Sequence, residues 1–449
     1  MAVTDVDRRA PSTGAPPATA IDGLRETEVG PLPRDWSVVT LGSRAAFRTG
    51  PFGSALHKSD YAEDGIPVIN PIHIVGGDLR PSRTVTVTEQ AARRLPEYRL
   101  ARDDIVIARR GDMGRCAVVG EQASGWLCGT GSMIVRCADG VCPDFVQAVL
   151  SSRRSISALE AASVGTTMVN LNRSILAALK IQMPPTKEEQ CAIAAVLSDA
   201  KDLIEAVDDL VEKMRAMKQG TMQQLLSGRA RLPSFTGDWP LRGLGDVLEF
   251  LRTANNPRAD LGEHGDLEYL HYGDVHLHSG PILDLKTEHL PRIDEYRTGR
   301  AERLRSGDLV MVDASEDLEG TTKSVEILNP EGRPVVAGLH TIACRGLSSD
   351  WALGFKAYLQ FMPDFRKAAA RMAAGISVFA LSSKQVSSIE LRLPPVPEQE
   401  AIVAVLTDME IEIRALQERG VKLRALGHGI SQALLTGKIR VQTPRKAPA

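Results

Sequence analysis

The stretch PPTKEEQCAIAAVLSDA (Pro184–Ala200) returns near the end of the chain as PPVPEQEAIVAVLTDM (Pro394–Met409). Glu398 then matches Glu189, which lies 209 positions earlier. Solenoid arrays repeat about every 20–50 residues, so a period this long indicates a duplicated module instead. Duplication suggests that the chain performs two similar tasks side by side.

Both stretches predict long helices. Apolar residues alternate spacings of four and three over about four heptads, which is the pattern of a coiled-coil seam. Paired prolines precede each helix, where a missing N–H is harmless, and Gly228 and Gly437 follow the last apolar turn, where a left-handed cap is favoured. About forty residues at 1.5 Å each give a rod of roughly 60 Å. The predicted seam comprises Ile193, Leu197, Ile204, Val207, Val211 and Met214 in the first helix and Ile402, Leu406, Met409, Ile413, Leu416 and Leu423 in the second.

A globular segment precedes each helix. The first begins at LPRDWSVVTLG (Leu32–Gly42) and the second at TGDWPLRGLG (Thr236–Gly245), and both continue with short β-branched runs broken by Gly and Asp, which are typical of strands. We therefore predict an α+β fold with two mixed, mostly β domains, each followed by a long helix, and with the two helices paired as an antiparallel coiled coil. Parallel pairing would place both domains at one end of the rod. Similar seams also occur in ordinary helix-pair cores and dimer interfaces.

Composition sets the expected boundaries. They are a disordered leader over residues 1–30, a first domain over 31–185, a helix over 186–230, a second domain over 231–395, a helix over 396–441 and a tail over 442–449.

The overall composition narrows the class of protein. The chain has 449 residues, 43% of them apolar, without an apolar run of the roughly 18 residues that a membrane-spanning helix needs, so we expect a soluble, cytoplasmic protein. Six cysteines form no CxxC pair, which favours reduced structural thiols over a zinc site. The formal net charge is −2, but residues 31–180 carry 18 Lys/Arg against 14 Asp/Glu, whereas residues 232–396 carry 18 against 23. These segment charges neither indicate nor exclude nucleic-acid binding, because a surface patch can be basic when the domain as a whole is not.

Further segments resemble the specificity subunit of type I restriction–modification systems, and the likeness extends over nearly all of residues 32–441. In the first copy they are GPFGSALHKSDYAEDGIPVIN (Gly50–Asn70), ARRGDMGR (Ala108–Arg115) and GTGSMIVR (Gly129–Arg136); in the second they are YLHYGDVH (Tyr269–His276), GDLVMVDASED (Gly307–Asp317) and AGLHTIA (Ala337–Ala343).

The resemblance implies that each globular segment is a target-recognition domain for one half of a bipartite DNA sequence. It also implies that the helix pair sets the spacing between the halves and docks two methyltransferase subunits. Double-stranded DNA and these subunits are the expected partners, restriction subunits are left open, and no membrane is involved. No cofactor is implied in this chain, because S-adenosylmethionine, ATP and Mg²⁺ would be bound by the partner subunits.

The first globular segment offers polar residues on or beside Gly-rich turns: Ser54, Lys58, Arg109, Arg110, Arg115, Thr130, Ser132, Thr166 and Asn170. Arg can hold guanine O6 and N7 through two hydrogen bonds, Asn suits adenine, and Lys and hydroxyl groups suit phosphates. The Arg109–Arg110 pair is the strongest candidate, although such a pair also occurs as solvated surface charge. Cap or turn duties would explain Thr166 and Asn170 nearly as well.

The second segment offers a different set: His271, Tyr272, His276, Asp313, Ser315, Lys323 and His340. A carboxylate here would repel phosphate, yet it can accept a hydrogen bond from cytosine N4. The sequence HLH (His276–His278) invites a metal interpretation, but no carboxylate or cysteine completes a plausible ligand spacing, and alternating strand residues are simpler. A protein-docking surface is the alternative for this more acidic segment.

No catalytic motif stands out. The chain lacks a glycine motif for a methyl donor and an NPPY-like motif, and GTTKS (Gly320–Ser324) lacks the upstream glycine that a phosphate-binding loop needs. We therefore expect a non-catalytic recognition subunit of a methyltransferase/endonuclease complex. A protein-interaction scaffold and an enzyme with an unrecognised site are the alternatives.

Overall fold

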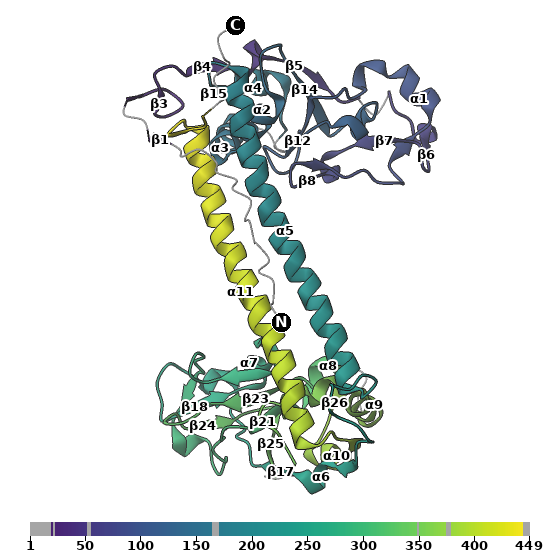
Figure 1. Cartoon of the computed structure of the whole chain (residues 1–449), viewed down its shortest axis with the longest axis vertical. Helices are drawn as coiled ribbons and strands as arrows, with labels where there is room; N and C mark the ends of the chain where they lie inside the picture. The colour runs from purple at the N-terminus through teal and green to yellow at the C-terminus, as the bar shows by residue number, and fades with distance from the viewer. Residues whose placement is uncertain are drawn as a thin grey trace, which may run out of the picture. The chain divides into compact units, whose positions relative to one another are not determined.

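The computed structural model of the chain, drawn in Figure 1, describes residues 19–20, 23–51, 55–163, 170–347, 350–373 and 379–442. The chain folds as two compact units. Unit 1 comprises residues 1–206 and 420–449, and unit 2 comprises residues 207–419. Each unit therefore contains one globular segment and a part of both long helices.

Two helices of 40 residues each, α5 (Lys187–Leu226) and α11 (Val396–Leu435), occupy the places where the apolar periodicity predicted them. Both end a few residues before the limits expected from the sequence, 230 and 441. Gly228 and Gly437 follow with φ of +67° and +66°, the left-handed conformation that glycine adopts without a steric penalty. All twelve predicted seam residues are buried or half-buried.

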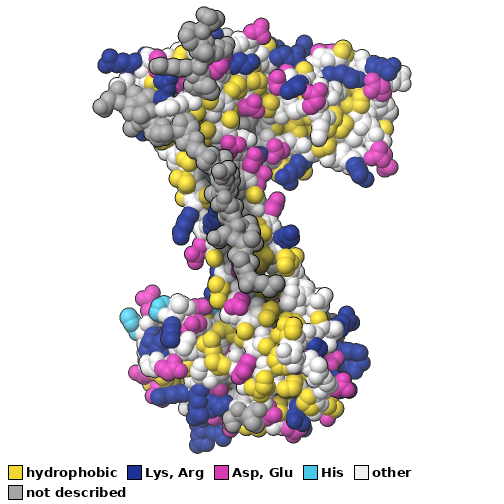
Figure 2. Space-filling view, viewed as in Figure 1, with side chains coloured by type: hydrophobic (Ala, Val, Ile, Leu, Met, Phe, Trp, Pro, Cys, Tyr) yellow, Lys and Arg dark blue, Asp and Glu magenta, His cyan; other side chains and the backbone are white. Residues whose placement is uncertain are grey.

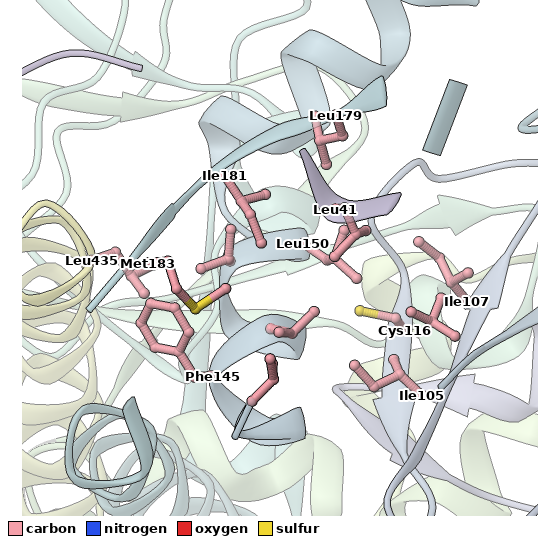
Figure 3. Packing of buried hydrophobic residues seen from close by; sticks show 14 of the residues in the cluster. Leu41, Ile105, Ile107, Cys116, Phe145, Leu150, Leu179, Ile181, Met183 and Leu435 are labelled. Carbon is pink, nitrogen blue, oxygen red and sulfur yellow. The ribbon is translucent and has the colours of Figure 1, made fainter. Parts of the chain in front are cut away.

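Unit 1 is built around an antiparallel sheet with strand order β12 (Cys116–Val118), β11 (Asp104–Ala108), β14 (Ser132–Cys137) and β5 (Ala45–Thr49). One face of this sheet packs on α2 (Pro143–Leu150) and α4 (Arg173–Ala178). The same core includes residues from both long helices. In Figure 3, Phe145 of α2 lies beside Met183, with Leu435 of α11 next to them.

A second, four-stranded sheet belongs to the globular part of unit 1, and a smaller apolar cluster packs on each of its faces. Its strands are β13 (Leu127–Cys128), β7 (Ile66–Ile69), β10 (Thr86–Val87) and β6 (Tyr61–Ala62). The same unit also contains the strand pair β8 (Ile74–Val75) and β9 (Asp78–Leu79) and the short helices α1 (Glu89–Arg94) and α3 (Arg153–Ala162).

Unit 2 repeats this plan with one more strand in the main sheet. The order is β17 (Leu248–Leu251), β25 (Thr341–Gly346), β21 (Leu309–Val312), β23 (Ser324–Leu328) and β19 (Ile282–Asp284). The smaller sheet has β20 (Arg292–Ile293), β18 (Leu267–Leu270) and β24 (Val335–Ala337), and β22 (Ala314–Ser315) pairs with β26 (Phe379–Ala380). The short helices are α6 (Leu244–Val247), α7 (Tyr272–Leu277), α8 (Leu318–Thr321), α9 (Pro363–Met372) and α10 (Ser383–Ser387).

The first and last strands of each globular segment pair with each other. In unit 1, β4 (Ser37–Thr40) lies antiparallel to β15 (Lys180–Met183); in unit 2, β16 (Leu241–Gly243) lies antiparallel to β27 (Glu390–Arg392). The two ends of each globular segment therefore lie side by side, and the C-terminal end continues directly into a long helix.

Part of the expected leader belongs to unit 1. Strand β2 (Leu24–Arg25) pairs with β3 (Leu32–Pro33), and β1 (Thr19–Ala20) pairs with β28 (Ile439–Arg440). Val29 is buried in the main core of the unit. The expectation of a disordered leader through residue 30 is therefore corrected for residues 23–30, because one apolar anchor and a short strand pair suffice to hold a segment of otherwise polar composition. Residues 1–18 and 21–22, and most of the expected tail, lie outside the described residues.

A buried carboxylate at the start of each long helix joins three parts of its unit. In unit 2, Glu398 accepts hydrogen bonds from Trp239 Nε1 at 3.0 Å and from Arg231 Nε and Nη2 at 2.5 and 2.7 Å. Trp239 opens the globular segment and Arg231 follows the end of α5. The Arg231 guanidinium also lies 5.4 Å from the centre of the Trp239 ring, within the range of a cation–π contact.

Unit 1 has the same arrangement. Glu189 accepts from Trp36 Nε1 at 3.3 Å and from Arg440 Nη2 at 2.8 Å, and Arg440 follows the end of α11. We call these two groups the Trp–Glu–Arg clusters. In each, the arginine comes from the end of the long helix that belongs to the other sequence repeat. Each unit is therefore closed by a segment distant in sequence.

The glutamine after each buried glutamate makes a parallel set of contacts. Gln190 accepts from the Cys142 N–H at 2.9 Å, and Gln399 accepts from the Ala352 N–H at 3.0 Å. Both amides donate to the carbonyl of a preceding proline, Pro184 or Pro394. The repeated Glu-Gln pair thus fixes the start of each helix against its own globular segment.

Contacts inside each unit also give the relative direction of the two helix segments. In unit 2, Lys218 of α5 pairs with Glu410 of α11, while Arg231 beyond the end of α5 meets Glu398 at the start of α11. Residue numbers rise along one helix as they fall along the other, so these segments run antiparallel. In unit 1, Arg440 beyond the end of α11 meets Glu189 at the start of α5, and a Cβ on Gly427 would lie 3.2 Å from Ile204 Cδ1, so the segments approach closely and also run antiparallel.

Among the described helices, none combines the length and the apolar character that crossing a bilayer requires. All six cysteines are free thiols. Burial raises the pKa of Cys116 and of Cys344 to about 12, which keeps these thiols protonated at neutral pH.

We predict that Arg231→Ala lowers the free energy of unfolding of unit 2 by about 3 kcal/mol, because it leaves the Glu398 carboxylate buried without its cation. Urea unfolding followed by tryptophan fluorescence measures the change. Arg229→Ala is the matched control, since Arg229 is exposed two residues away and should change stability by less than about 0.5 kcal/mol. Equal effects of the two substitutions would show that the unit 2 cluster does not stabilise the unit.

Candidate nucleic-acid interface

Strand pairing brings two of the segments singled out from the sequence to one edge of unit 1. Strands β11 and β14 pair antiparallel with Ala108 opposite Ser132, so the turn after β11 lies beside the turn before β14. The Arg109 N–H donates to the Gly131 carbonyl at 2.9 Å. We call residues 109–111 and 129–131 the unit 1 edge.

Arg109 and Arg110 have different surroundings. Arg109 is half-buried and its Nε donates to the Leu171 carbonyl at 3.0 Å, while the Leu171 N–H donates back to the Arg109 carbonyl at 2.8 Å. Burial, and secondarily the neighbouring positive charge of Arg110, lowers the pKa of Arg109. Arg109 thus anchors the segment around Leu171 to the sheet. Arg110 is exposed and makes no hydrogen bond or ion pair with the residues that the structure describes.

The other candidates of the first segment divide between surface and interior. Thr130 is exposed at the unit 1 edge, whereas Ser132 is fully buried. Arg115 forms an ion pair with Asp112 and its Nη1 donates to the Pro71 carbonyl at 3.4 Å. Asn170 Oδ1 and Ser132 Oγ are buried without a hydrogen-bond partner among the described residues. Ser54 and Thr166 lie outside the described residues, as does the side chain of Lys58.

Unit 2 has an equivalent edge, and the structure gathers the predicted residues there. Val312 at the end of β21 lies opposite Thr341 at the start of β25, so Asp313 meets His340. The Asp313 N–H donates to the His340 carbonyl at 3.2 Å, and Asp313 Oδ1 lies 3.3 Å from His340 Nδ1. We call residues 313–315 and 338–340 the unit 2 edge.

His340 is held in an unusual backbone conformation. Its φ is +56°, in the left-handed region that side chains other than glycine rarely adopt. Its imidazole is about half exposed. An ionised Asp313 carboxylate can only accept, so His340 Nδ1 carries the proton in this contact, and Nε2 of a neutral imidazole could then accept a hydrogen bond. A strained, partly exposed side chain whose tautomer is fixed by a neighbour is typical of a binding site.

Aromatic and histidine rings pack beside this edge. The Tyr272 ring is edge-on to His340 with centroids 5.5 Å apart and edge-on to His276 at 6.0 Å. Lys323 Nζ donates to the His276 carbonyl at 2.5 Å. A Cβ on Gly320 would lie 2.3 Å from Ser315 Oγ and 2.9 Å from His276 Cε1, so α8 packs closely on both. Tyr272, His276, Asp313, Ser315, Lys323 and His340 therefore form one cluster.

His271 has a structural part in this cluster. It caps α7: its Nδ1 accepts from the Gly273 N–H at 3.2 Å, and Asp274 accepts from the His271 N–H at 3.1 Å. Burial lowers the pKa of His271, and burial followed by the charge of Lys323 lowers that of His276, so both rings are neutral at neutral pH. Burial raises the pKa of Asp313, and the His340 contact opposes that rise.

A buried tyrosine that the sequence analysis did not select fixes the unit 2 edge. Tyr269 Oη accepts from the N–H groups of Asn256 and Leu339 at 2.9 and 3.0 Å and donates to the Asn256 carbonyl at 2.9 Å. A Cβ on Gly338 would lie 2.0 Å from the Tyr269 ring, so only glycine fits there. At the unit 1 edge, a Cβ on Gly129 would lie 2.2 Å from Asn70 Oδ1. The turn of the unit 1 edge therefore packs against Asn70, directly after β7, and the turn of the unit 2 edge packs against Tyr269 of β18.

The described residues contain no group of three or more His, Cys, Asp or Glu side chains arranged to hold a metal ion. His278 Nε2 donates a hydrogen bond to the Ile282 carbonyl, 2.7 Å away, and its Nδ1 lies 3.3 Å from Glu288 Oε2. Its ring nitrogens are therefore engaged within the protein.

The chain is similar in sequence to proteins of one family. Residues 33–213 match the family model described as the type I restriction modification DNA specificity domain. Two curated relatives come from Methanocaldococcus jannaschii. The putative type I restriction enzyme MjaX specificity subunit is 22% identical, over 94% of this chain and 98% of the relative. The type I restriction enzyme MjaVIII specificity subunit is 23% identical, over 92% and 94%.

Solved structures show the same fold. One chain, from a study of complex assembly and conformational transition of the type I R-M system, superposes with a TM-score of 0.56 at 19% identity and covers 91% of this chain and 99% of its own length. The S subunit of a type I restriction-modification system from M. genitalium superposes with a TM-score of 0.51 at 17% identity, over 91% and 97%.

We predict that Tyr269→Phe loosens the unit 2 edge, because three backbone hydrogen bonds lose their common partner. The expected cost is about 1–3 kcal/mol, and the Leu339 and Asn256 amides should exchange with deuterium faster than in the unsubstituted protein. Tyr296→Phe is the control, since Tyr296 is 83% exposed. Unchanged exchange at Leu339 would contradict the assigned role of Tyr269.

Proposed function

Because this chain belongs to the family of type I restriction–modification specificity subunits, we propose that it selects the DNA sequence on which such a complex acts. It is a recognition subunit and not itself an enzyme. The observation that carries the proposal is the repeated edge: in each unit, two polar turns meet at the end of the paired strands β11–β14 or β21–β25. Two similar edges suit the two halves of one bipartite target.

We assign different chemistry to the two edges. At the unit 1 edge, Arg110 can donate two hydrogen bonds to guanine, and Thr130 can contact a base or a phosphate. At the unit 2 edge, His340 Nε2 can accept a hydrogen bond from cytosine N4 or adenine N6 in the major groove. The acidic Asp313 fixes the imidazole from behind. The negative charge of Asp313 is therefore compatible with DNA binding, because it orients the His340 ring and need not face a phosphate.

The long helices would act as the spacer. We propose that the antiparallel segments described within each unit continue as one coiled coil of α5 and α11; the Lys218–Glu410 ion pair and the approach of Gly427 to Ile204 support this. A rod of two helices keeps the separation of two DNA-reading domains constant, whereas a flexible linker would not. Half-sites on one face of DNA lie about 34–36 Å apart, one helical turn.

The helices also offer a surface for partner subunits. Leu203, Leu210 and Met217 are 47%, 42% and 51% exposed, and they recur every seventh residue, so they lie on one side of α5. We propose that two methyltransferase subunits dock on the helix pair, with restriction subunits joining through them. S-adenosylmethionine, ATP and Mg²⁺ would bind to those partners. A subunit with this task works in the cytoplasm, where its DNA is.

If the helix pair sets the spacer, lengthening it should change the recognised motif in one respect. We predict that a seven-residue insertion near the middle of both α5 and α11 preserves both half-sites and lengthens the spacer by about three base pairs, since seven residues add roughly 10 Å and base pairs are about 3.4 Å apart. Methylation mapping of cells that carry the variant with its methyltransferase gives the motif. A length-preserving exchange of seven helical residues is the control. An unchanged spacer would exclude the helices as the ruler.

If each edge reads one half-site, a change at one edge should affect one half only. We predict that His340→Ala relaxes the preference at one position of the unit 2 half-site, corresponding to about 1–3 kcal/mol of discrimination, while the other half-site stays as it was. His264→Ala is the control, because His264 is exposed away from this edge. If the variant methylates the same motif as the unsubstituted protein, His340 does not read DNA. Partner binding without any sequence-dependent methylation would favour the protein-interaction scaffold.

A further inference from the structure

Strand β5 forms the outer edge of the main sheet of unit 1, and two adjoining hollows lie along it. They have volumes of about 610 and 320 Å³ and share Phe47 and Arg173 in their linings. Five arginines line the two hollows, against a single acidic residue, Glu97. We call this surface the β5 groove; its arginines are Arg48, Arg99, Arg109, Arg136 and Arg173. In Figure 2, Lys and Arg side chains are interspersed with Asp and Glu side chains over the part of unit 1 that carries β5 and β14 in Figure 1.

The five arginines differ in how far their charge is compensated. Arg136 forms two hydrogen bonds of 2.7 Å with the buried Asp104, and Arg99 pairs with Glu89 at 3.0 Å. Arg109 is committed to the Leu171 carbonyl. Arg48 and Arg173 are exposed and have neither a hydrogen-bond nor an ion-pair partner within the described ranges. The groove therefore carries two uncompensated positive charges between guanidinium groups that are already fixed in place.

The groove is continuous with the unit 1 edge. Arg109 belongs to both, and Gly50, directly after β5, donates its N–H to the Ser132 carbonyl at 3.0 Å, so β5 ends beside the turn that holds Thr130. Strand β5 is separated from β11 by β14 alone, which puts it about 10 Å from β11 at the usual strand spacing. The major groove of DNA is about 12 Å wide, with a sugar–phosphate backbone along each side.

These dimensions match a duplex read at the unit 1 edge. A side chain at the end of β11 that meets a base edge would place β5 over the backbone that borders the same groove. We propose that the β5 groove holds the sugar–phosphate backbone of duplex DNA beside the half-site of unit 1, with Arg48 and Arg173 as phosphate contacts. This inference rests on the proposed function and adds a contact that does not depend on base sequence.

Two other roles of the β5 groove explain fewer of its features. They are protection of the sheet edge and binding of an acidic protein segment. A charged residue on an edge strand prevents pairing with another chain, but that role needs Arg48 alone and not Arg173 of α4 or the flanking Arg99 and Arg136. An acidic protein segment could also bind arginines. Continuity with the unit 1 edge favours DNA, because the same duplex then occupies both surfaces.

The test is the double variant Arg48→Gln/Arg173→Gln in the complete complex with its methyltransferase subunits. Binding is measured at several salt concentrations to a duplex with the bipartite site and to a duplex with that site scrambled. Each phosphate contact contributes about −0.9 to the slope of log K against log salt, so the magnitude of the slope should fall by roughly 2. Affinity for both duplexes should fall roughly 10- to 100-fold near 0.1 M salt, and the methylated motif should not change.

Three controls separate phosphate binding in the groove from a general loss of charge or of stability. Arg83→Gln/Arg153→Gln removes two exposed arginines elsewhere on unit 1 and should leave the slope unchanged. Arg48→Lys/Arg173→Lys keeps the charge and should retain most of the slope. Thermal unfolding should be the same for all variants, because Arg48 and Arg173 are exposed and unpaired among described residues.

Several outcomes would overturn the proposal. One is an unchanged salt slope in the Gln double variant while the wild-type complex still methylates a bipartite motif; the proposed function would then stand and the groove would not. Another is an equal loss in the Arg83/Arg153 control. A third is weakened binding of the methyltransferase subunits with unaltered DNA affinity, which would make the groove a protein-docking surface. If the wild-type complex shows no sequence preference, the proposed function fails, yet a reduced slope would still support phosphate binding in the groove.

Discussion

The buried glutamate at the start of each long helix is the constraint on which the rest of the structure depends. Glu189 and Glu398 are 5% and 1% exposed, and each binds the tryptophan of its own globular segment and the arginine beyond the end of the other repeat's helix. A carboxylate without these donors would be costly to bury. The start of one helix, the end of the other and the globular segment are therefore fixed together within each unit.

This contact accounts for the places where the repeat is most visible. The Glu-Gln pair, the tryptophan and the arginine all recur, because each of them contacts at least two other parts of the unit. The turns at the two edges recur only in position. Arg109-Arg110 at one edge and Asp313-Ala314 at the other follow equivalent strands, yet they carry opposite charge. Repeated contacts at the helix starts combined with different turns at the two edges would suit a duplicated protein that recognises two different half-sites.

Much of the architecture could be predicted from the sequence, since it depends on local patterns. Heptad spacing located α5 and α11, and the glycines after them have the left-handed backbone expected of caps. Short β-branched runs bounded by Gly and Asp located β11, β14, β21 and β25. The polar turns could be selected because Gly and charged residues follow these strands directly.

What could not be predicted depends on contacts between residues far apart in the chain. The hydrogen bonds of Arg109 to Leu171 and of Arg115 to Pro71 separate anchoring residues from exposed ones, and spacing alone does not show this. The same holds for Tyr269, and for Glu326, which is buried in unit 2 against Lys356 at 3.2 Å and against two backbone N–H groups. Arg48 and Arg173 lie 125 positions apart, and their shared groove appears only when β5 is placed at the sheet edge.

The account is tested most directly by the methylation map of a host that expresses this chain with its methyltransferase subunit and no other specificity subunit. Two similar DNA-reading domains held at a fixed separation predict one motif in two defined parts with a spacer of constant length and unspecified sequence. A single contiguous motif, a spacer of variable length, or methylation without sequence preference would contradict it.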